Sequence, residues 1–434
     1  MEHPFAVFRP RPAERPSMTE ASMIIHNVHI ENSTETMDIR VTDGRIGEIG
    51  ACLPVHAGDM TVDGHSGVAI PPFVDPHVHL DAALTAGEPE WNETGTLFDG
   101  IRIWSERKKT LSRQDVKDRA VHTLRMMASH GIQYVRTHVD VTDSNLVALD
   151  AMLEVREQVS PFITLQIVAF PQEGILSYPD GRQLMERAVD AGADVVGGIP
   201  HFEFNRDYGV ESLKFLVDLA ARNGRLVDVH CDEIDDPASR NLEVLATLAL
   251  ETGLGARVTA SHTTAMGSYN DAYAYKLFRL LRMSGINFVS NPLVNMHLGG
   301  RFDTYPKRRG LTRVKELDEA GINVAFGEDD IRDPWSPLGA GNMLDAVHMG
   351  VYAAQLMGYQ QIMDSYKYVT INGARTLNIP ETDYGIAVGK PASLVILDAP
   401  DFYQALNEHA EILYNIRNGR IIAETTPRAT RLHI

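Results

Sequence analysis

A regular alternation of short apolar runs and helix-like segments through the middle of the chain is the feature that most restricts its fold. Eight apolar runs of strand length recur over roughly 300 residues, which is a length that one α/β barrel can occupy. The runs cover residues 68–70, 134–139, 164–170, 194–198, 226–229, 257–260, 287–290 and 323–326. Helix-like segments follow at residues 115–130, 144–157, 182–191, 210–223, 242–251, 273–284, 313–320 and 343–357.

Two architectures share this alternation, the (β/α)8 barrel and the doubly wound parallel sheet. The doubly wound sheet is disfavoured because no glycine-rich phosphate loop follows an early strand. Eight strands match the count that a closed barrel requires. We therefore predict a distorted (β/α)8 TIM barrel over residues 71–379.

Both ends of the chain have a different, β-rich pattern. Near the N-terminus, residues 24–30, 38–41 and 45–49 alternate as short strands, and Asp43-Gly44 is a hairpin signal between the last two. Near the C-terminus, residues 392–397, 412–414 and 420–423 have the same pattern. We predict one small β-sandwich domain from residues 23–70 and 380–434. Residues 1–22 are predicted to be a flexible lead, in which Met18, or Met23 just after it, is a candidate start.

The charge and the cysteine count restrict the partners and the compartment. Acidic residues outnumber basic ones by 58 to 40, which gives a net charge of -18. Such a field repels phosphate backbones and anionic lipids, so we expect neither a nucleic acid nor a membrane as partner. Two cysteines do not make a disulfide scaffold, and no segment has the N-terminal apolar run of a secretory signal. We therefore expect a cytoplasmic enzyme.

Residues typical of metal ligands gather just after the predicted strands. His77 and His79 follow the first run, His230 the fifth, His262 the sixth and Asp329 the eighth. The carboxyl ends of barrel strands form the active-site face of this fold. The spacing of His77 and His79 directs both imidazoles to the same side of an extended segment. Seventeen histidines placed at random would not select strand ends so consistently, so the pattern predicts a metal site.

The end of the fourth strand indicates how many metal ions this site holds. A two-metal site needs a bridging ligand, and in many barrels of this type a carboxylated lysine after the fourth strand supplies it. Residues 194–202 contain no lysine, so we predict one divalent ion per chain. Imidazole and carboxylate ligands suit both zinc and iron, and the sequence does not separate the two.

With these motifs in place, the chain resembles the amidohydrolase superfamily, and more narrowly its bacterial cytosine deaminase branch. The likeness extends from about residue 24 to near the C-terminus. It is carried by PxxVDPHxH at residues 71–79, WNETGTLF at 91–98, VAFPQEG at 168–174, PHFEF at 200–204, VHCDE at 229–233, SH at 261–262, NPLVN at 291–295, RFDTYPKRR at 301–309 and DD at 329–330. The HxH pair is widespread in the superfamily, whereas the longer blocks are much more specific.

The resemblance implies a reaction and a set of metal ligands. The reaction is the hydrolytic loss of ammonia from a cyclic amidine-type carbon. The ligands of one zinc or iron ion are then His77, His79, His230 and Asp329, and Asp329 also takes the proton from the water that the metal activates.

The resemblance also assigns the residues around the substrate ring. Glu233 delivers a proton to the ring nitrogen beside the attacked carbon, and His262 orients the attacking hydroxide. Gln172 reads the carbonyl and ring-nitrogen edge with its donor and acceptor pair. Asp330 lies at the rim of the substrate site, and Trp335 covers the ring.

One departure bears on the substrate. Glu328 precedes the ligand Asp329, where this branch commonly has histidine, and a carboxylate there is expected to alter the substrate preference. Cytosine to uracil is the first prediction, with creatinine, isoguanine or 5-methylcytosine as alternatives. A cyclic amide hydrolase and a catalytically inactive barrel are further alternatives. Glu233 and the missing lysine after the fourth strand argue against a cyclic amide hydrolase. The intact set of metal ligands argues against an inactive barrel. The branch also suggests a homo-oligomer.

Overall fold

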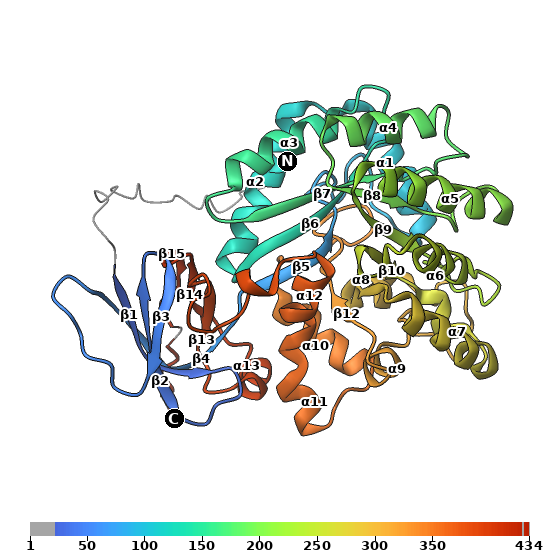
Figure 1. Ribbon diagram of the computed structural model, residues 1–434. Coiled ribbons are helices and arrows are strands. Elements are labelled where there is room, and N and C mark those ends of the chain that lie inside the picture. Colours follow the sequence, from blue (N-terminus) through green and yellow to red (C-terminus); the bar gives the residue numbers. More distant parts are fainter. Residues whose placement is uncertain (1–21, 428, 434) are drawn as a thin grey trace.

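The computed structural model describes residues 22–427 and 429–433, and its strands form two separate sheets (Figure 1). The larger sheet contains eight parallel strands in simple sequential order, so the predicted (β/α)8 barrel is confirmed. Its strands are β5 (Phe73–Val78), β6 (Ile132–Asp140), β7 (Thr164–Phe170), β8 (Val195–Gly198), β9 (Leu226–Cys231), β10 (Val258–His262), β11 (Asn287–Ser290) and β12 (Val324–Phe326).

The barrel closes between its first and last strands at the level of the predicted metal ligands. Val78 and Asp329 form an isolated parallel bridge. The backbone N–H of His79 donates to the carbonyl oxygen of Asp329 at 2.9 Å. The backbone N–H of Asp329 donates to the carbonyl oxygen of His77 at 2.8 Å. The seam that completes the barrel therefore also fixes the backbone of three predicted ligands.

The first barrel strand was predicted too early in the chain. Residues 68–70 are the end of β4 (Met60–Ile70), which belongs to the smaller sheet, and the first barrel strand is β5. Pro71 and Pro72 separate the two strands, and neither can donate a ladder hydrogen bond. As a result, His77 lies within β5 and His79 just beyond it.

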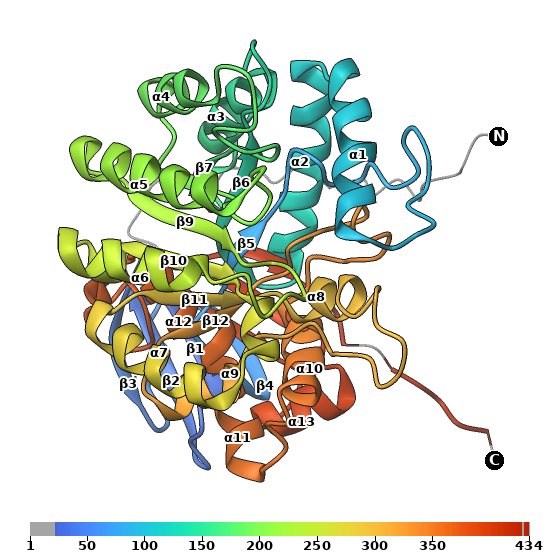
Figure 2. The same cartoon turned by 90° about the vertical axis from the view of Figure 1, so that its right-hand side faces the viewer.

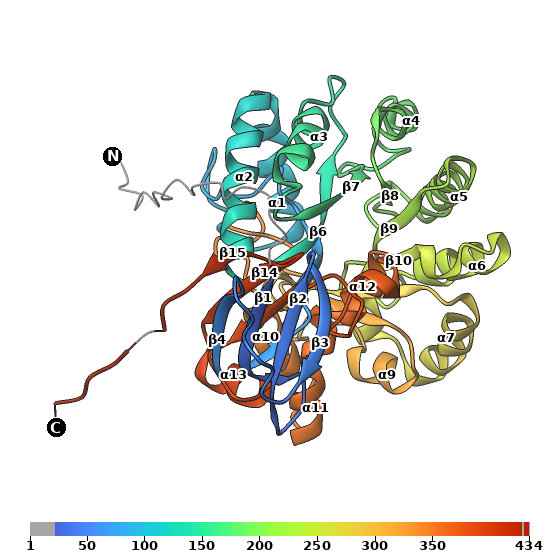
Figure 3. The same ribbon diagram turned by 60° about the vertical axis from the view of Figure 1, so that its left-hand side comes forward.

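Helices surround the barrel strands on the outside (Figures 2 and 3). The eight predicted helical segments are found as α2 to α7, α9 and α10. The helices are α1 (Leu97–Arg107), α2 (Arg113–Ser129), α3 (Val147–Val159), α4 (Gly181–Ala191), α5 (Arg206–Asn223), α6 (Asn241–Thr252), α7 (Asp271–Ser284), α8 (Pro292–Leu298), α9 (Val314–Glu319), α10 (Met343–Ala353), α11 (Tyr359–Met363), α12 (Ile371–Thr376) and α13 (Phe402–Glu408). Helices α1 and α8, which we did not predict, lie at the rim of the site described below.

The helix ends follow ordinary capping chemistry, as α5 illustrates. The side chain of Asn205 accepts a hydrogen bond from the backbone N–H of Tyr208 at 3.0 Å and so satisfies one of the unpaired donors of the first turn. At the other end, Gly224 adopts φ 64°, a left-handed conformation that costs glycine little.

The smaller sheet joins the two ends of the chain. In Figure 1 its blue and dark red strands lie together at the lower left. Its seven strands run in the order β15-β14-β13-β4-β1-β2-β3, and β1 pairs with β4 in parallel while the other neighbours are antiparallel. The strands besides β4 are β1 (Met23–Ile30), β2 (Thr36–Thr42), β3 (Arg45–Gly50), β13 (Leu394–Leu397), β14 (Ile412–Arg417) and β15 (Arg420–Glu424).

This sheet folds over a core of its own. Ile25, Ile39, Ile46, Leu394 and Ile416 belong to one buried cluster that is separate from the barrel core. A bridge between Arg45 and Pro391 also brings edge strand β3 next to the start of the C-terminal half. The predicted small domain from both termini is therefore present, and it is one continuous curled sheet. The predicted lead lies outside the described residues, apart from Ser22. Among the described helices, none combines the length and the apolarity that crossing a bilayer requires.

Candidate active site

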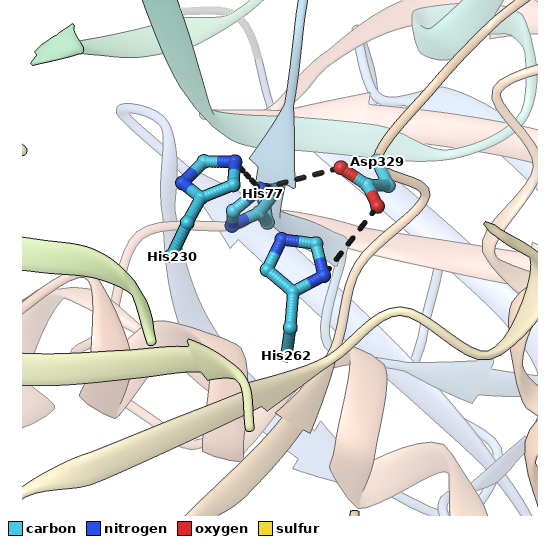
Figure 4. A group of neighbouring side chains, drawn as sticks. All are labelled: His77, His230, His262 and Asp329. Carbon is cyan, nitrogen blue, oxygen red and sulfur yellow. Dashed lines mark hydrogen bonds and ion pairs between the residues drawn. The ribbon is translucent and has the colours of Figure 1, made fainter. Parts of the chain in front are cut away.

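The four predicted metal ligands come from three places around the barrel and meet at its carboxyl end, and Figure 4 shows three of them, His77, His230 and Asp329. His77 lies in β5 and His79 follows it, His230 lies in β9, and Asp329 lies three residues after β12. His262 is the last residue of β10 and points into the same space. All five side chains are almost fully buried.

The donor atoms of the four predicted ligands converge on one point. The Nε2 atom of His230 lies 3.2 Å from Nε2 of His77 and 3.1 Å from Nε2 of His79. Asp329 Oδ1 lies 3.3 Å from Nε2 of His77 and 3.5 Å from Nε2 of His79. Four donors bound at about 2.1 Å to one zinc ion stand about 3.4 Å apart at the corners of a tetrahedron. These four separations are of the size that a single ion requires.

His262 can be compared with His79 as the remaining imidazole donor. The group of donor atoms that all lie within 4.8 Å of one another consists of His77, His230, His262 and Asp329, whereas His79 groups with Asp329 and Asp330. However, Nδ1 of His262 lies 3.8 Å from Oδ2 of Asp329, on the side away from the oxygen that faces His77 and His79. The shorter separations favour His79 as the ligand and leave His262 beside the metal position.

The protonation states suit a cation at this point. Burial lowers the pKa of His230 and of His262 well below the ordinary value, and the neighbouring imidazoles lower both further. Burial alone raises the pKa of Asp329, but His262, His77 and His79 together hold it well below its usual range. Burial alone lowers the pKa of His79, but Asp329 outweighs it and raises the pKa above its ordinary value. Neutral imidazoles and an ionised carboxylate are the forms that bind divalent metals, so His230 and Asp329 are in the state that binds a cation, and His79 has to lose any proton to do so.

The backbone around the site is strained. Asp329 has φ 71° and His262 has φ 65°, and both lie in the left-handed region that non-glycine residues rarely adopt. Each such residue costs on the order of 1–3 kcal/mol. The surrounding structure holds this strain where the two side chains must converge, which is typical of functional sites.

Glu233 lies beside His262 and away from the four ligands. Its Oε1 is 3.1 Å from Nδ1 of His262. The side-chain amide of Asn295 contacts both partners, at 3.0 Å from Nδ1 of His262 and 3.4 Å from Oε1 of Glu233. Burial raises the pKa of Glu233 well above its ordinary value, and the charge of Asp329 adds to the effect. This shift favours the protonated form of Glu233, which is the form that a general acid requires.

Asn295 was not predicted as a site residue. It lies on α8, whose Pro292 occupies a first-turn position where proline is well tolerated. Its Oδ1 accepts a hydrogen bond from the backbone N–H of Asn291 at 3.3 Å, which directs the NH₂ group towards Glu233 and His262. Asn295 is part of the NPLVN segment at residues 291–295. The only signal in that segment was Pro292, which is typical of a helix start, and it did not indicate a role for Asn295.

A pocket of about 260 Å³ opens next to the ligands and contains every predicted substrate residue. Its wall is formed by His79, Leu97, Gln172, His230, Glu233, His262, Leu298, Asp329, Asp330 and Trp335. The indole of Trp335 lies 6.1 Å from the ring of His79 at an interplanar angle of 30°. The structure thus brings Gln172, Asp330 and Trp335 together with the predicted acid and the predicted ligands.

Glu328 points away from this pocket. Its Oε1 accepts a hydrogen bond from the backbone N–H of Gly341 at 3.1 Å, and its own N–H donates to Oδ1 of Asp75 at 3.2 Å. Burial, with Asp75 nearby, raises the pKa of Glu328 well above its ordinary value. The side chain supports the loop that returns to residue 341, so its position does not support the expected direct effect on substrate preference.

We expect Glu328→Gln to leave the ranking of substrates unchanged, with each relative kcat/KM within about twofold of the wild type. The amide side chain keeps an acceptor for Gly341 and adds no group to the pocket. The measurement is relative kcat/KM over a panel of ring substrates, with Gln172→Ala as a variant that does alter the pocket wall. A reordered panel in Glu328→Gln would show that the residue acts on specificity after all.

Comparisons with known proteins agree with this geometry. The sequence model of the amidohydrolase family matches residues 60–423. N-isopropylammelide isopropyl amidohydrolase from Pseudomonas sp. strain ADP is 31% identical over 93% of this chain and 97% of that protein. Pterin deaminase from Rhizobium rhizogenes is 30% identical over 90% of this chain and 88% of that protein. The crystal structure of 5-methylcytosine deaminase from Klebsiella pneumoniae with 5-fluorocytosine is 54% identical, has a TM-score of 0.92, and covers 94% of this chain and 99% of that chain.

Proposed function

Because the chain belongs to the amidohydrolase family, we propose that it is a metal-dependent deaminase that releases ammonia from a cytosine-type ring. The observation that carries this proposal is the placement of the buried carboxyl group of Glu233 beside His262, in the same small pocket as His79, His230 and Asp329. The family and its deaminase members support hydrolysis of a carbon–nitrogen bond.

We assign each proton transfer of the reaction to a different side chain. A divalent ion bound by His77, His79, His230 and Asp329 supplies a Lewis acid that lowers the pKa of a water molecule towards about 7. Oδ1 of Asp329 faces the imidazoles, whereas Oδ2 faces His262, so Asp329 can accept the proton of the attacking water on its second oxygen.

Glu233 then donates its proton to the ring nitrogen next to the amine-bearing carbon, which makes that carbon more electrophilic. His262 holds the attacking water through its ring nitrogen and relays the proton that Asp329 accepted to the leaving amine. The oxygen of the water bonds to the carbon, the carbon–nitrogen bond breaks, and ammonia departs. The remaining proton of the new hydroxyl group returns to Glu233 as that oxygen becomes the carbonyl of the product. Gln172 matches the carbonyl and ring-nitrogen edge, Asp330 contacts the ring from the rim, and the indole of Trp335 covers its face.

We propose cytosine and 5-methylcytosine as the first substrates. The support is the 54% identity to a solved 5-methylcytosine deaminase over nearly the whole of both chains. The test is ammonia release from cytosine, 5-methylcytosine, isoguanine, isocytosine and creatinine at matched concentrations. Activity confined to creatinine or isoguanine would replace the proposed substrate, and no release from any ring would overturn the proposed reaction.

We expect about one equivalent of zinc or iron per chain in the active protein. The four ligands enclose one position, and no lysine follows β8 between residues 199 and 205 to bridge a second ion. The measurement is elemental analysis of purified protein against its concentration, before and after dialysis with a chelator. Two equivalents that both correlate with activity would contradict a mononuclear site. The choice between zinc and iron, the cytoplasmic location and the homo-oligomer stay predictions from the sequence.

A further inference from the structure

A buried lysine lies behind the substrate pocket and is not explained by the chemistry above. Lys108 is the first residue of the 3₁₀ helix η1 (Lys108–Thr110), directly after α1. Its Nζ donates to Oε1 of Glu173 at 2.6 Å, to Oγ1 of Thr142 at 2.7 Å and to Oδ2 of Asp140 at 2.9 Å. All three ammonium hydrogens therefore have acceptors, and only 10% of the side chain is exposed.

The charges of this cluster depend on the lysine. Burial alone lowers the pKa of Lys108, but Asp140 and Glu173 outweigh it and raise the pKa above its ordinary value. Asp140 is held ionised in return, since Lys108 and Thr142 offset the effect of its burial and lower its pKa. One cation thus joins two carboxylates, one at the end of β6 and one in the loop after β7.

The loop after β7 carries Gln172, the residue that matches the edge of the ring. The carboxylate of Glu203, which follows β8, accepts hydrogen bonds from the backbone N–H groups of Ile175 at 2.7 Å and Ser177 at 2.8 Å in this loop. These bonds fix the half of the loop after Gly174. The proximal half, next to Gln172, is fixed by the contact between Glu173 and Lys108. Two carboxylate anchors therefore hold the loop on either side of Gly174.

The same lysine is joined to the opposite wall of the pocket through α1. Leu97, at the start of this helix, lines the pocket. Trp104, near its end, donates from Nε1 to Oδ2 of Asp140 at 3.0 Å and packs in one cluster with Trp335. Lys108 thus connects both sides of the ring-binding space without touching the ring.

We propose that Lys108 is a positioning residue for substrate recognition, which locks the Gln172 loop against α1 through Glu173 and Asp140. The proposal rests on the proposed function, because it assumes that Gln172 binds the ring. It gives Lys108 no part in proton transfer or in metal binding. Loss of the lysine is therefore expected to affect ring binding, and the chemical step much less.

The decisive variant is Lys108→Met, with Lys109→Met as matched control. Lys109 is the next residue of η1, its amino group pairs with Glu106 near the end of α1, and its side chain is 65% exposed. We expect Lys108→Met to raise KM for the ring substrate by roughly tenfold or more, as for the loss of a well-placed hydrogen bond, with kcat within a few-fold and metal content unchanged. Lys109→Met is expected to match the wild type.

Two additional variants separate positioning from plain charge balance. Lys108→Met with Glu173→Gln restores the net charge of the cluster but not the bridge, so we expect thermal stability to recover while KM stays raised. Glu173→Ala removes the loop anchor from a partly exposed position and is expected to raise KM with little effect on folding. A double variant with wild-type KM would show that the lysine only balances charge, and would overturn the proposal.

Hydrogen exchange of the loop gives a readout that does not depend on the reaction. Backbone amides of residues 172–178 are expected to exchange faster in Lys108→Met and in Glu173→Ala than in the wild type or in Lys109→Met. Equal exchange in all four proteins would overturn the positioning role even if no tested ring proved to be a substrate. An inactive wild type whose loop responds as expected would instead overturn the proposed function alone.

Discussion

Glu233→Gln is expected to lower kcat by roughly 10²–10⁴-fold, the range over which general acid–base groups contribute to catalysis. The glutamine keeps the size of the side chain and can still contact Asn295 and His262, but it has no proton to give to the ring nitrogen. Since Glu233 is not one of the four convergent ligands, the variant should hold as much metal as the wild type.

The measurement is kcat for cytosine or 5-methylcytosine together with elemental analysis of the same sample. Asp236→Asn is a suitable control, because the carboxylate of this exposed residue of the same acidic loop accepts a hydrogen bond from the backbone N–H of Ala238, which an amide oxygen can also accept. We expect the control to keep its full rate. Near-normal turnover in Glu233→Gln would show that the acid has been assigned to the wrong residue.

The part of this site that could be predicted from sequence is the part that barrel geometry forces to one end. His230 and His262 are adjacent to apolar runs, and parallel strands bring such positions to a common edge whatever the loops do. Asp329 follows the shortest strand, which is still recognisable because it is wholly apolar. The resemblance to deaminases added the catalytic roles of these residues, which the spacing of apolar residues does not indicate.

The errors occurred where a strand carries polar residues or a helix is short. Strand β5 is interrupted in sequence by Asp75 and Pro76, so it does not look apolar, although all of its residues are buried. Strand β4 contains Gly64, His65 and Ser66, the last two with positive φ, which hides its period. Helix α8 has seven residues, too few for a helical period to show.

Trp335 and Lys108 illustrate a further limit of sequence patterns. Trp335 lies in an irregular loop, where Asp333 accepts a hydrogen bond from its backbone N–H at 2.9 Å, and only the resemblance pointed to it. Lys108 resembles any lysine at a helix end until its three acceptors are seen together, and two of these come from residues 34 and 65 positions away. Contacts of that range depend on the tertiary fold.

Arg136→Met is expected to destabilise the folded protein by about 3–5 kcal/mol, the cost of leaving one member of a buried ion pair without its partner. Arg136 and Asp228 are both fully buried inside the barrel, with Nη1 2.8 Å from Oδ2. Asp228 also accepts from Oγ of Ser261 at 2.6 Å, and Arg136 donates from Nη2 to the carbonyl oxygen of Thr376 at 2.8 Å. The methionine leaves the carboxylate buried in the barrel interior without its cation.

The measurement is the free energy of unfolding from urea denaturation, with Arg113→Met as control. Arg113 makes ion pairs with Asp150 and Glu154 at the surface, where removal is expected to cost less than about 1 kcal/mol. Combining Arg136→Met with Asp228→Leu removes both charges and should recover most of the loss. Wild-type stability in the single variant would mean that Asp228 finds another partner.

The same ion pair also reaches the metal site, so the expected loss is not confined to stability. The ring of His138 stacks on that of His77 at 3.9 Å between centroids, and its Nε2 lies 3.8 Å from Oδ2 of Asp228. A carboxylate without Arg136 attracts that imidazole, and the stacked ligand His77 can no longer keep its place. We therefore expect Arg136→Met to bind its metal more weakly than Arg113→Met, as measured by the chelator concentration that removes half of the ion. Equal metal retention in the two variants would show that the Arg136–Asp228 ion pair does not affect metal binding.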